Sequence, residues 1–130
     1  MSEETPVTRL YDALARGDVA AMRACCAPDV RFWHCFDGIA QTLDESVQGW
    51  EGLIAHTKTR HSEDVRSIPT GDGLVQQFLF VVRTPAGERK AWPLCVVVKL
   101  KDGLITRVDE YIDRAGSFAA AEGPVTTPGF

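Results

Sequence analysis

The sequence predicts an α+β fold, with helices near the N-terminus packed on a sheet that the second half of the chain mainly forms. Three segments within residues 6–61 carry apolar side chains at helical spacing, whereas residues 64–113 alternate in short runs separated by turns. Grouped helices followed by grouped strands differ from the regular alternation of βαβ units. The 130 residues, 45% hydrophobic and 25% charged, fit one globular domain.

Two helices open the chain. Thr5 is a suitable N-cap, Pro6 suits the first helical position, and Gly17 ends the first helix. Asp18 can cap a second helix over residues 19–27, which the following proline stops. The side chains expected to face the core from these helices are Val7, Leu10, Tyr11, Leu14, Met22, Cys25 and Cys26.

A strand and a third helix follow. Residues 30–36 alternate between two faces, which predicts a strand. One of these faces carries Val30, Phe32, His34 and Phe36. Residues 46–61 have the apolar spacing of a helix. Gly49 and Gly52 lower the helix propensity of its first turn and favour a start near Trp50.

The rest of the domain reads as a meander of strands. The expected strands are residues 64–68, 74–84, 89–100 and 104–113. Pro93 lies inside the third of these and predicts a bulge or an edge. The domain is expected over residues 1–114, followed by a flexible tail over residues 115–130, which is rich in Ala, Gly, Pro and Thr.

Charge and composition argue against several classes of function. The net charge is −4, and no basic stripe marks a nucleic-acid or membrane surface. No apolar run approaches the ~20 residues of a membrane span. The acidic start lacks a secretory pattern, so a cytoplasmic protein is expected. The four cysteines (Cys25, Cys26, Cys35 and Cys95) and the three histidines show no metal-ligand spacing, so neither a metal nor a cofactor is expected.

Four segments resemble the nuclear-transport-factor-two-like superfamily, and its SnoaL-like members in particular. They are residues 10–18 (LYDALARGD), 27–30 (APDV), 49–54 (GWEGLI) and 102–113, which begins DGLITR and ends YID. The superfamily includes ketosteroid isomerase, limonene epoxide hydrolase, scytalone dehydratase and polyketide cyclases. The resemblance implies three helices on a strongly curved, mixed but mostly antiparallel sheet that forms a conical pocket, often in a homodimer.

The resemblance also implies positions for catalytic groups. Counting from Pro28, the carboxylate base of ketosteroid isomerase falls on His34. The tyrosine of its oxyanion hole falls on Leu10, one place before Tyr11, and the aspartic acid of that hole falls on Val96. That enzyme is a known example of a carboxylic acid kept neutral to donate a hydrogen bond. Its oxyanion hole is therefore not reproduced in this sequence.

His34 is the main catalytic candidate. Free histidine has a pKa of about 6.5, so an imidazole can take or give a proton near neutral pH. The alternative is a histidine that only bonds a neighbour in the core. Asp37 orients His34 or acts alone, unless it is an ordinary Asp-Gly loop residue. Glu110 and Asp109 lie on opposite faces of one strand; either can be the acid–base carboxylate, and the alternative is a solvated or interface charge.

Further side chains are candidates for contact with a substrate. Trp92 shares strand parity with Val96 and can stack on a planar ligand. Gln76 and Gln77 face opposite ways, and Gln77 is taken as the inward one. The complete set is Tyr11, Phe32, Phe36, Trp50, His56, Gln77, Trp92 and Val96. Core packing is the alternative for Tyr11 and Trp50, and surface exposure is the alternative for His56.

Two functions fit these residues. The first is an enzyme without a cofactor, of the isomerase, dehydratase or cyclase type, that moves a proton on a small apolar carbonyl or hydroxyl compound. The second is a non-catalytic domain that binds a small ligand or dimerises. The expected partners are a small apolar or weakly polar molecule and a second copy of the chain, with Val97 and Tyr111 on the shared sheet face.

Overall fold

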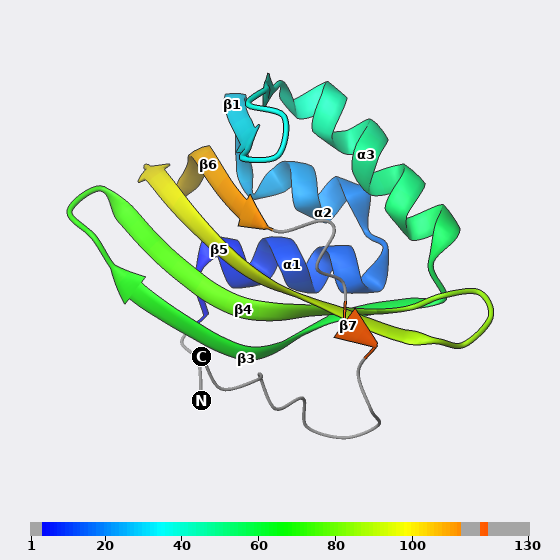
Figure 1. The fold of residues 1–130 in the computed structure, drawn as a ribbon. Helices are drawn as coiled ribbons and strands as arrows, with labels where there is room; N and C mark the ends of the chain where they lie inside the picture. The colour runs from blue at the N-terminus through cyan, green and yellow to red at the C-terminus, as the bar shows by residue number, and fades with distance from the viewer. Residues whose placement is uncertain (1–3, 113–117, 120–130) are drawn as a thin grey trace.

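The computed structural model describes residues 4–112 and the backbone of residues 118–119. Over these residues, three helices pack on one face of a single curved sheet (Figure 1). The helices are α1 (Pro6–Arg16), α2 (Val19–Ala24) and α3 (Leu43–His56). The strands are β1 (Cys26–His34), β2 (Ala40–Gln41), β3 (Thr59–Pro69), β4 (Gly73–Arg83), β5 (Arg89–Lys101), β6 (Leu104–Ile112) and β7 (Phe118–Ala119).

The sheet is mixed but mostly antiparallel, as expected. Its strand order is β2-β1-β6-β5-β4-β3, and β7 pairs with the first half of β5. The β1–β6 pair is parallel, and the other neighbours are antiparallel. Figure 1 shows β3, β4 and β5 curving across α1, while α3 lies over the β1 end of the sheet. The α+β architecture predicted from the sequence is confirmed.

The core lies between the helices and the inner face of the sheet. Strand β4 shows the alternation that builds it, because every second side chain is buried. These inward side chains are Leu74, Gln76, Phe78, Phe80 and Val82. Helix α1 contributes Val7, Leu10 and Leu14, each 3% exposed or less. Burial of a leucine side chain of this kind contributes about 2 kcal/mol to the free energy of unfolding.

The first helix forms as its capping residues predict. The Thr5 hydroxyl accepts a hydrogen bond from the Thr8 amide at 3.1 Å, and Gly17 ends the helix with a φ of 69°. The Asp18 carboxylate likewise accepts a hydrogen bond from the amide of Ala21 and so caps the N-terminus of α2. A φ above zero is strained for side chains other than glycine, so Gly17 is required at the end of α1.

The second helix is shorter than predicted. It ends at Ala24 instead of reaching residue 27, because Cys26 already pairs with Ile105 as the first residue of β1. Pro28 therefore lies inside a strand instead of ending a helix. It occupies the irregular stretch between Cys26 and Arg31 where the β1–β6 register shifts, a position that tolerates a residue without an amide proton.

The prediction for the third helix is wrong at both ends. Helix α3 begins at Leu43, because Thr42 and Glu45 form a capping box: the Thr42 hydroxyl accepts from the Glu45 amide, and the Glu45 carboxylate accepts from the Thr42 amide. The helix ends at His56, and β3 begins at Thr59. Long-range pairing with β4 thus outweighs the helical spacing of residues 57–61.

Arg60 fixes the two long helices relative to the sheet. From β3, its guanidinium donates to the carbonyl oxygens of Leu14 and Ala15 at 3.0 and 3.2 Å, at the end of α1. It also donates to Ile54 and Thr57 at the end of α3, most closely to the Thr57 hydroxyl at 2.8 Å. A cation at helix C-termini also interacts favourably with both helix dipoles.

The remaining connections follow the turn residues. Asp102 and Gly103 have φ values of 54° and 78°, the backbone of a tight hairpin turn. Pro93 pairs with Leu79 in unbroken register, so it causes no bulge in the pairing of β5 with β4. Of the tail predicted over residues 115–130, only β7 lies within the described residues.

None of the helices in the described part of the chain has the length and apolarity that crossing a bilayer requires.

Candidate functional site

The sheet brings a histidine and a glutamate together on its inner face. In the parallel β1–β6 pair, His34 lies directly opposite Glu110. Imidazole Nε2 is 3.6 Å from carboxylate Oε2. The two side chains are 16% and 19% exposed, so solvent reaches both although most of their surface is buried. The separation is slightly longer than a hydrogen bond, and a small side-chain movement closes it.

Burial changes the chemistry of Glu110. Loss of hydration raises the pKa of its carboxyl group to about 7. Apart from His34, the carboxylate has no hydrogen-bond or ion-pair partner within residues 4–112. Near neutral pH the group is therefore present in both protonated and ionised forms, which is the condition for acting as acid and base in turn.

Tyr11 adds a neutral hydrogen-bond donor. Its ring packs on Phe78 and Phe80 of β4, with ring centroids 4.7 and 6.2 Å apart. Burial, and secondarily the negative charge of Glu110, raise the pKa of Tyr11 well above its usual value. The hydroxyl therefore keeps its proton, and it donates to no group in the part of the chain that the structure describes.

The polar pair belongs to a row that crosses the inner face of the sheet. Glu110 on β6 lies opposite Val96 on β5, Val96 lies opposite Gln76 on β4, and Gln76 lies opposite Ser67 on β3. Val96 and Gln76 are almost completely buried, at 0% and 1% exposure. Val96 faces the core, and the row places the buried Gln76 and the partly exposed Glu110 on either side of it.

Aromatic side chains surround this row. Phe32 is buried and contacts Trp50 of α3 edge to face, at 5.2 Å between ring centroids. Trp92 is half-buried and packs against the same core. Phe36 stacks on the His34 imidazole at 5.1 Å but is 43% exposed. The expectation that Phe36 faces inward from a strand is wrong, because β1 ends at His34 and the chain turns there.

Asp37 does not orient His34 in this structure. Its carboxylate accepts a hydrogen bond from the Ile39 amide at 2.9 Å, which closes the exposed turn after β1. The loop alternative considered for this residue is therefore the observed one. The carboxylate beside the imidazole comes instead from Glu110, a residue far away in the sequence.

Three other candidates lie away from the inner face. Asp109 points outward beside Arg107, whose Nε donates to its carboxylate at 2.8 Å. Gln77 lies on the opposite face of β4 from Gln76, so the inward choice between the two glutamines was wrong. His56 is exposed at the end of α3, with Nδ1 2.7 Å from the Gly52 carbonyl oxygen. The alternation of β4 with Leu74 and Phe78 was the signal that favours Gln76.

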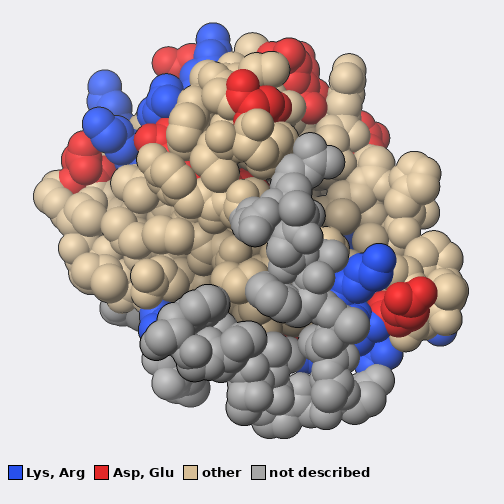
Figure 2. All heavy atoms as spheres, viewed as in Figure 1, with Lys and Arg blue, Asp and Glu red and all other residues tan. Residues whose placement is uncertain are grey.

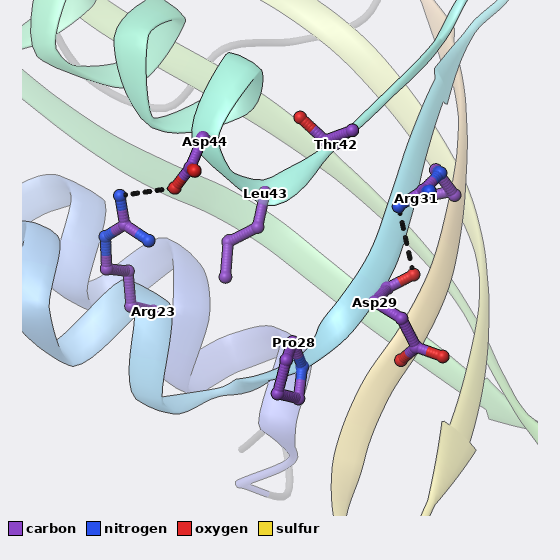
Figure 3. Close-up of a pocket in the computed structure, with 7 residues that line it drawn as sticks. All are labelled: Arg23, Pro28, Asp29, Arg31, Thr42, Leu43 and Asp44. Carbon is purple, nitrogen blue, oxygen red and sulfur yellow. Dashed lines mark hydrogen bonds and ion pairs between the residues drawn. The ribbon is translucent and has the colours of Figure 1, made fainter.

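A hollow lies on the surface between α2, β1 and the start of α3 (Figure 3). Its volume is about 490 Å³. The lining residues are Arg23, Pro28, Asp29, Arg31, Thr42, Leu43 and Asp44. Arg23 and Asp44 form an ion pair at 2.9 Å across it. In Figure 2 this end of the molecule, at the top, carries both acidic and basic side chains, and the hollow has no buried acid–base pair.

A curved, mixed but mostly antiparallel sheet with three helices on one face is the architecture of the nuclear-transport-factor-two-like class of domains. The chain belongs to the SnoaL-like domain family, whose model matches residues 7–108. No curated protein matches it in sequence. Within residues 4–112, no group of three or more His, Cys, Asp or Glu side chains is arranged to hold a metal ion.

Solved structures confirm the fold. IdmH of Streptomyces antibioticus, a candidate polyketide cyclase, is 17% identical, with a TM-score of 0.75 over 85% of this chain and 91% of that one. A candidate polyketide cyclase of Xanthomonas campestris is 21% identical, with a TM-score of 0.72 over 83% and 87%. A Catenulispora acidiphila protein with a ketosteroid isomerase-like fold, solved with trimethylamine, is 18% identical, with a TM-score of 0.70 over 85% and 86%.

Proposed function

We propose that this chain catalyses proton transfer on a small, largely apolar carbonyl or hydroxyl compound, with His34 and Glu110 as its acid–base pair. The observation that carries the proposal is the partly accessible pair at 3.6 Å on the inner face of the sheet. A pKa of about 7 for Glu110 supports both directions of proton transfer at neutral pH.

The chemistry needs only groups that the chain supplies. With the Glu110 carboxyl group ionised, the pair takes a proton from the carbon next to a carbonyl group, and the electron pair of the broken C–H bond moves toward the carbonyl oxygen. Tyr11 donates a hydrogen bond to that oxygen as negative charge develops on it. The pair then returns the proton to another atom of the substrate, which regenerates the starting state.

Isomerisation, dehydration and aldol-type cyclisation can all begin with this step. The aromatic surroundings of the site favour an apolar, planar substrate. Similarity in fold to candidate polyketide cyclases supports a reaction of the cyclisation type within this set. We therefore favour enolate chemistry on a ring-forming or ring-containing carbonyl compound.

Deuterium exchange tests the proposal without knowledge of the natural substrate. The probe is 2-tetralone, an apolar ketone with acidic protons, incubated with the protein in D₂O and followed by proton NMR. The wild type is expected to accelerate exchange, and Glu110→Gln and His34→Gln are each expected to slow it by about 100-fold or more. Asp109→Asn is the matched control, since it alters the neighbouring carboxylate on the outer face.

The exchange rates separate the two functions considered. Rates of the Glu110→Gln and His34→Gln variants within a few-fold of wild type would overturn the assignment of the pair. Chemical-shift changes from bound 2-tetralone, without any accelerated exchange by the wild type, would instead support a non-catalytic ligand-binding domain. Thermal unfolding of each variant shows whether a lost rate reflects chemistry or misfolding.

A further inference from the structure

Gln76 is a buried polar residue that the acid–base pair does not explain. It occupies an inward position of β4 between Leu74 and Phe78, where an apolar side chain would complete the core, and it is 1% exposed. A buried amide lowers stability unless its groups are hydrogen-bonded. Gln76 lies directly opposite Val96 of β5, which in turn lies opposite Glu110 of β6. Gln76 is therefore in the same row as the proposed catalytic pair.

Only the oxygen atom of the Gln76 amide has a hydrogen-bond partner among the described residues. The Ser67 hydroxyl of β3 donates to Gln76 Oε1 at 3.3 Å. The two polar atoms of an amide point in different directions from the amide carbon, so the contact with Ser67 does not satisfy Nε2. Within the described residues Nε2 donates to no acceptor, although the residue is only 1% exposed.

The charges around this row favour an uncharged ligand. Glu110 is the carboxylate of the row, and the side chains that lie with it on the inner face are His34, Val96, Gln76 and Ser67. Tyr11 lies over Phe78, the next inward residue of β4 after Gln76. An anionic ligand would meet Glu110 without a lysine or arginine in the row to balance it.

We infer that Gln76, oriented by Ser67, acts with Tyr11 as a site of two uncharged donors that holds the oxygen of a neutral carbonyl substrate. This inference rests on the proposed function and extends it. When the pair takes the substrate proton, the C–H electron pair becomes the new C–C π bond of an enolate. The charge then collects on the oxygen, and two neutral donors there stabilise it without attracting anions beforehand.

Binding of 2-naphthol tests the donor site separately from turnover. This planar phenol has the shape of the enol of 2-tetralone, and its fluorescence distinguishes the phenol from the phenolate. The variant is Gln76→Met, which keeps the length of the side chain and removes its amide. We expect about tenfold weaker binding of 2-naphthol and about 100-fold slower exchange of 2-tetralone. Gln77→Met, on the opposite face of the same strand, is the control and should change neither.

A second variant keeps the inference testable if Gln76→Met does not fold. Ser67→Ala removes the hydroxyl that orients the amide and is expected to weaken 2-naphthol binding two- to fivefold. Unchanged affinity and exchange in a folded Gln76→Met would overturn the inference and show that the amide only holds a structural water. Failure of the wild type to bind 2-naphthol would overturn it as well.

The outcomes distinguish this inference from the proposed function. If Glu110→Gln abolishes exchange while Gln76→Met leaves it intact, the acid–base pair stands and the donor role of Gln76 fails. If no protein accelerates exchange but Gln76→Met weakens binding of 2-naphthol, the donor site stands and catalysis by the pair fails.

Discussion

Arg60 and the His34–Glu110 pair are two sites with ionisable side chains on the same side of one sheet, and their hydrogen-bonding surroundings differ. Arg60 donates to five oxygen acceptors at the ends of α1 and α3. Glu110 has only His34 beside it within residues 4–112, and burial raises the pKa of its carboxyl group to about 7. A buried charge that the protein fully satisfies stabilises the fold, whereas one left poorly satisfied is available to bind a ligand or move a proton.

The largest effect on stability is expected at Arg60. Arg60→Met should lower the free energy of unfolding by about 4 kcal/mol, because several partly buried carbonyl oxygens at the ends of two helices lose their donor. Chemical denaturation measures this difference. Arg66→Met is the control, since Arg66 is exposed on the same strand and a surface change of this kind costs less than about 0.5 kcal/mol. A loss below about 1 kcal/mol at Arg60 would contradict its role in fixing the helices.

A smaller effect on stability is expected at Glu110, where ionisation of the carboxyl group destabilises the folded protein. Its pKa is about 7 in the folded protein and 4.5 in the reference state, so between these values the folded state holds a proton that the unfolded state releases. Stability should therefore fall as pH rises from about 5 to about 8, by about 2 kcal/mol. Below this range both states are protonated, so the stability is at its highest and no longer depends on the titration of Glu110.

Glu110→Gln tests whether this carboxyl group causes the pH dependence of stability. The variant should unfold with a flatter pH dependence than the wild type and should be the more stable protein at pH 8. Denaturation curves at pH 5 and pH 8 for both proteins measure the difference. A pH dependence that the substitution leaves unchanged would show that the carboxylate is not held in an unfavourable state.

The smallest effect on activity is expected on the outer face of the sheet. Val97 and Tyr111 are 37% and 47% exposed there, and Trp33 contacts Tyr111 at 5.4 Å between ring centroids. We propose that a second copy of the chain covers this face. Val97→Lys should convert dimers to monomers in sedimentation while deuterium exchange stays within about twofold of wild type. A wild-type protein that sediments as a monomer would contradict the proposal.

Local structure can be predicted from the sequence where one residue type decides the backbone conformation. Thr5 and Gly17 mark both ends of α1, and Asp102-Gly103 forms the predicted turn. The start of α3 was missed although Thr42 and Glu45 carry a capping signal, because the glycines that follow lower helix propensity. Those glycines are tolerated, since their positions are open and the capping box stabilises the first turn.

The class of fold, the alternation of the central strands β4, β5 and β6 and an inward histidine at position 34 can all be predicted from the residues alone. Which of Asp109 and Glu110 faces that histidine, and which of Gln76 and Gln77 faces the core, depends on the packed structure. Alternation establishes only that neighbouring residues of a strand lie on opposite faces. The choice between the faces follows from where the helices pack, and the pairing of β1 with β6 depends on contacts between residues far apart in the chain.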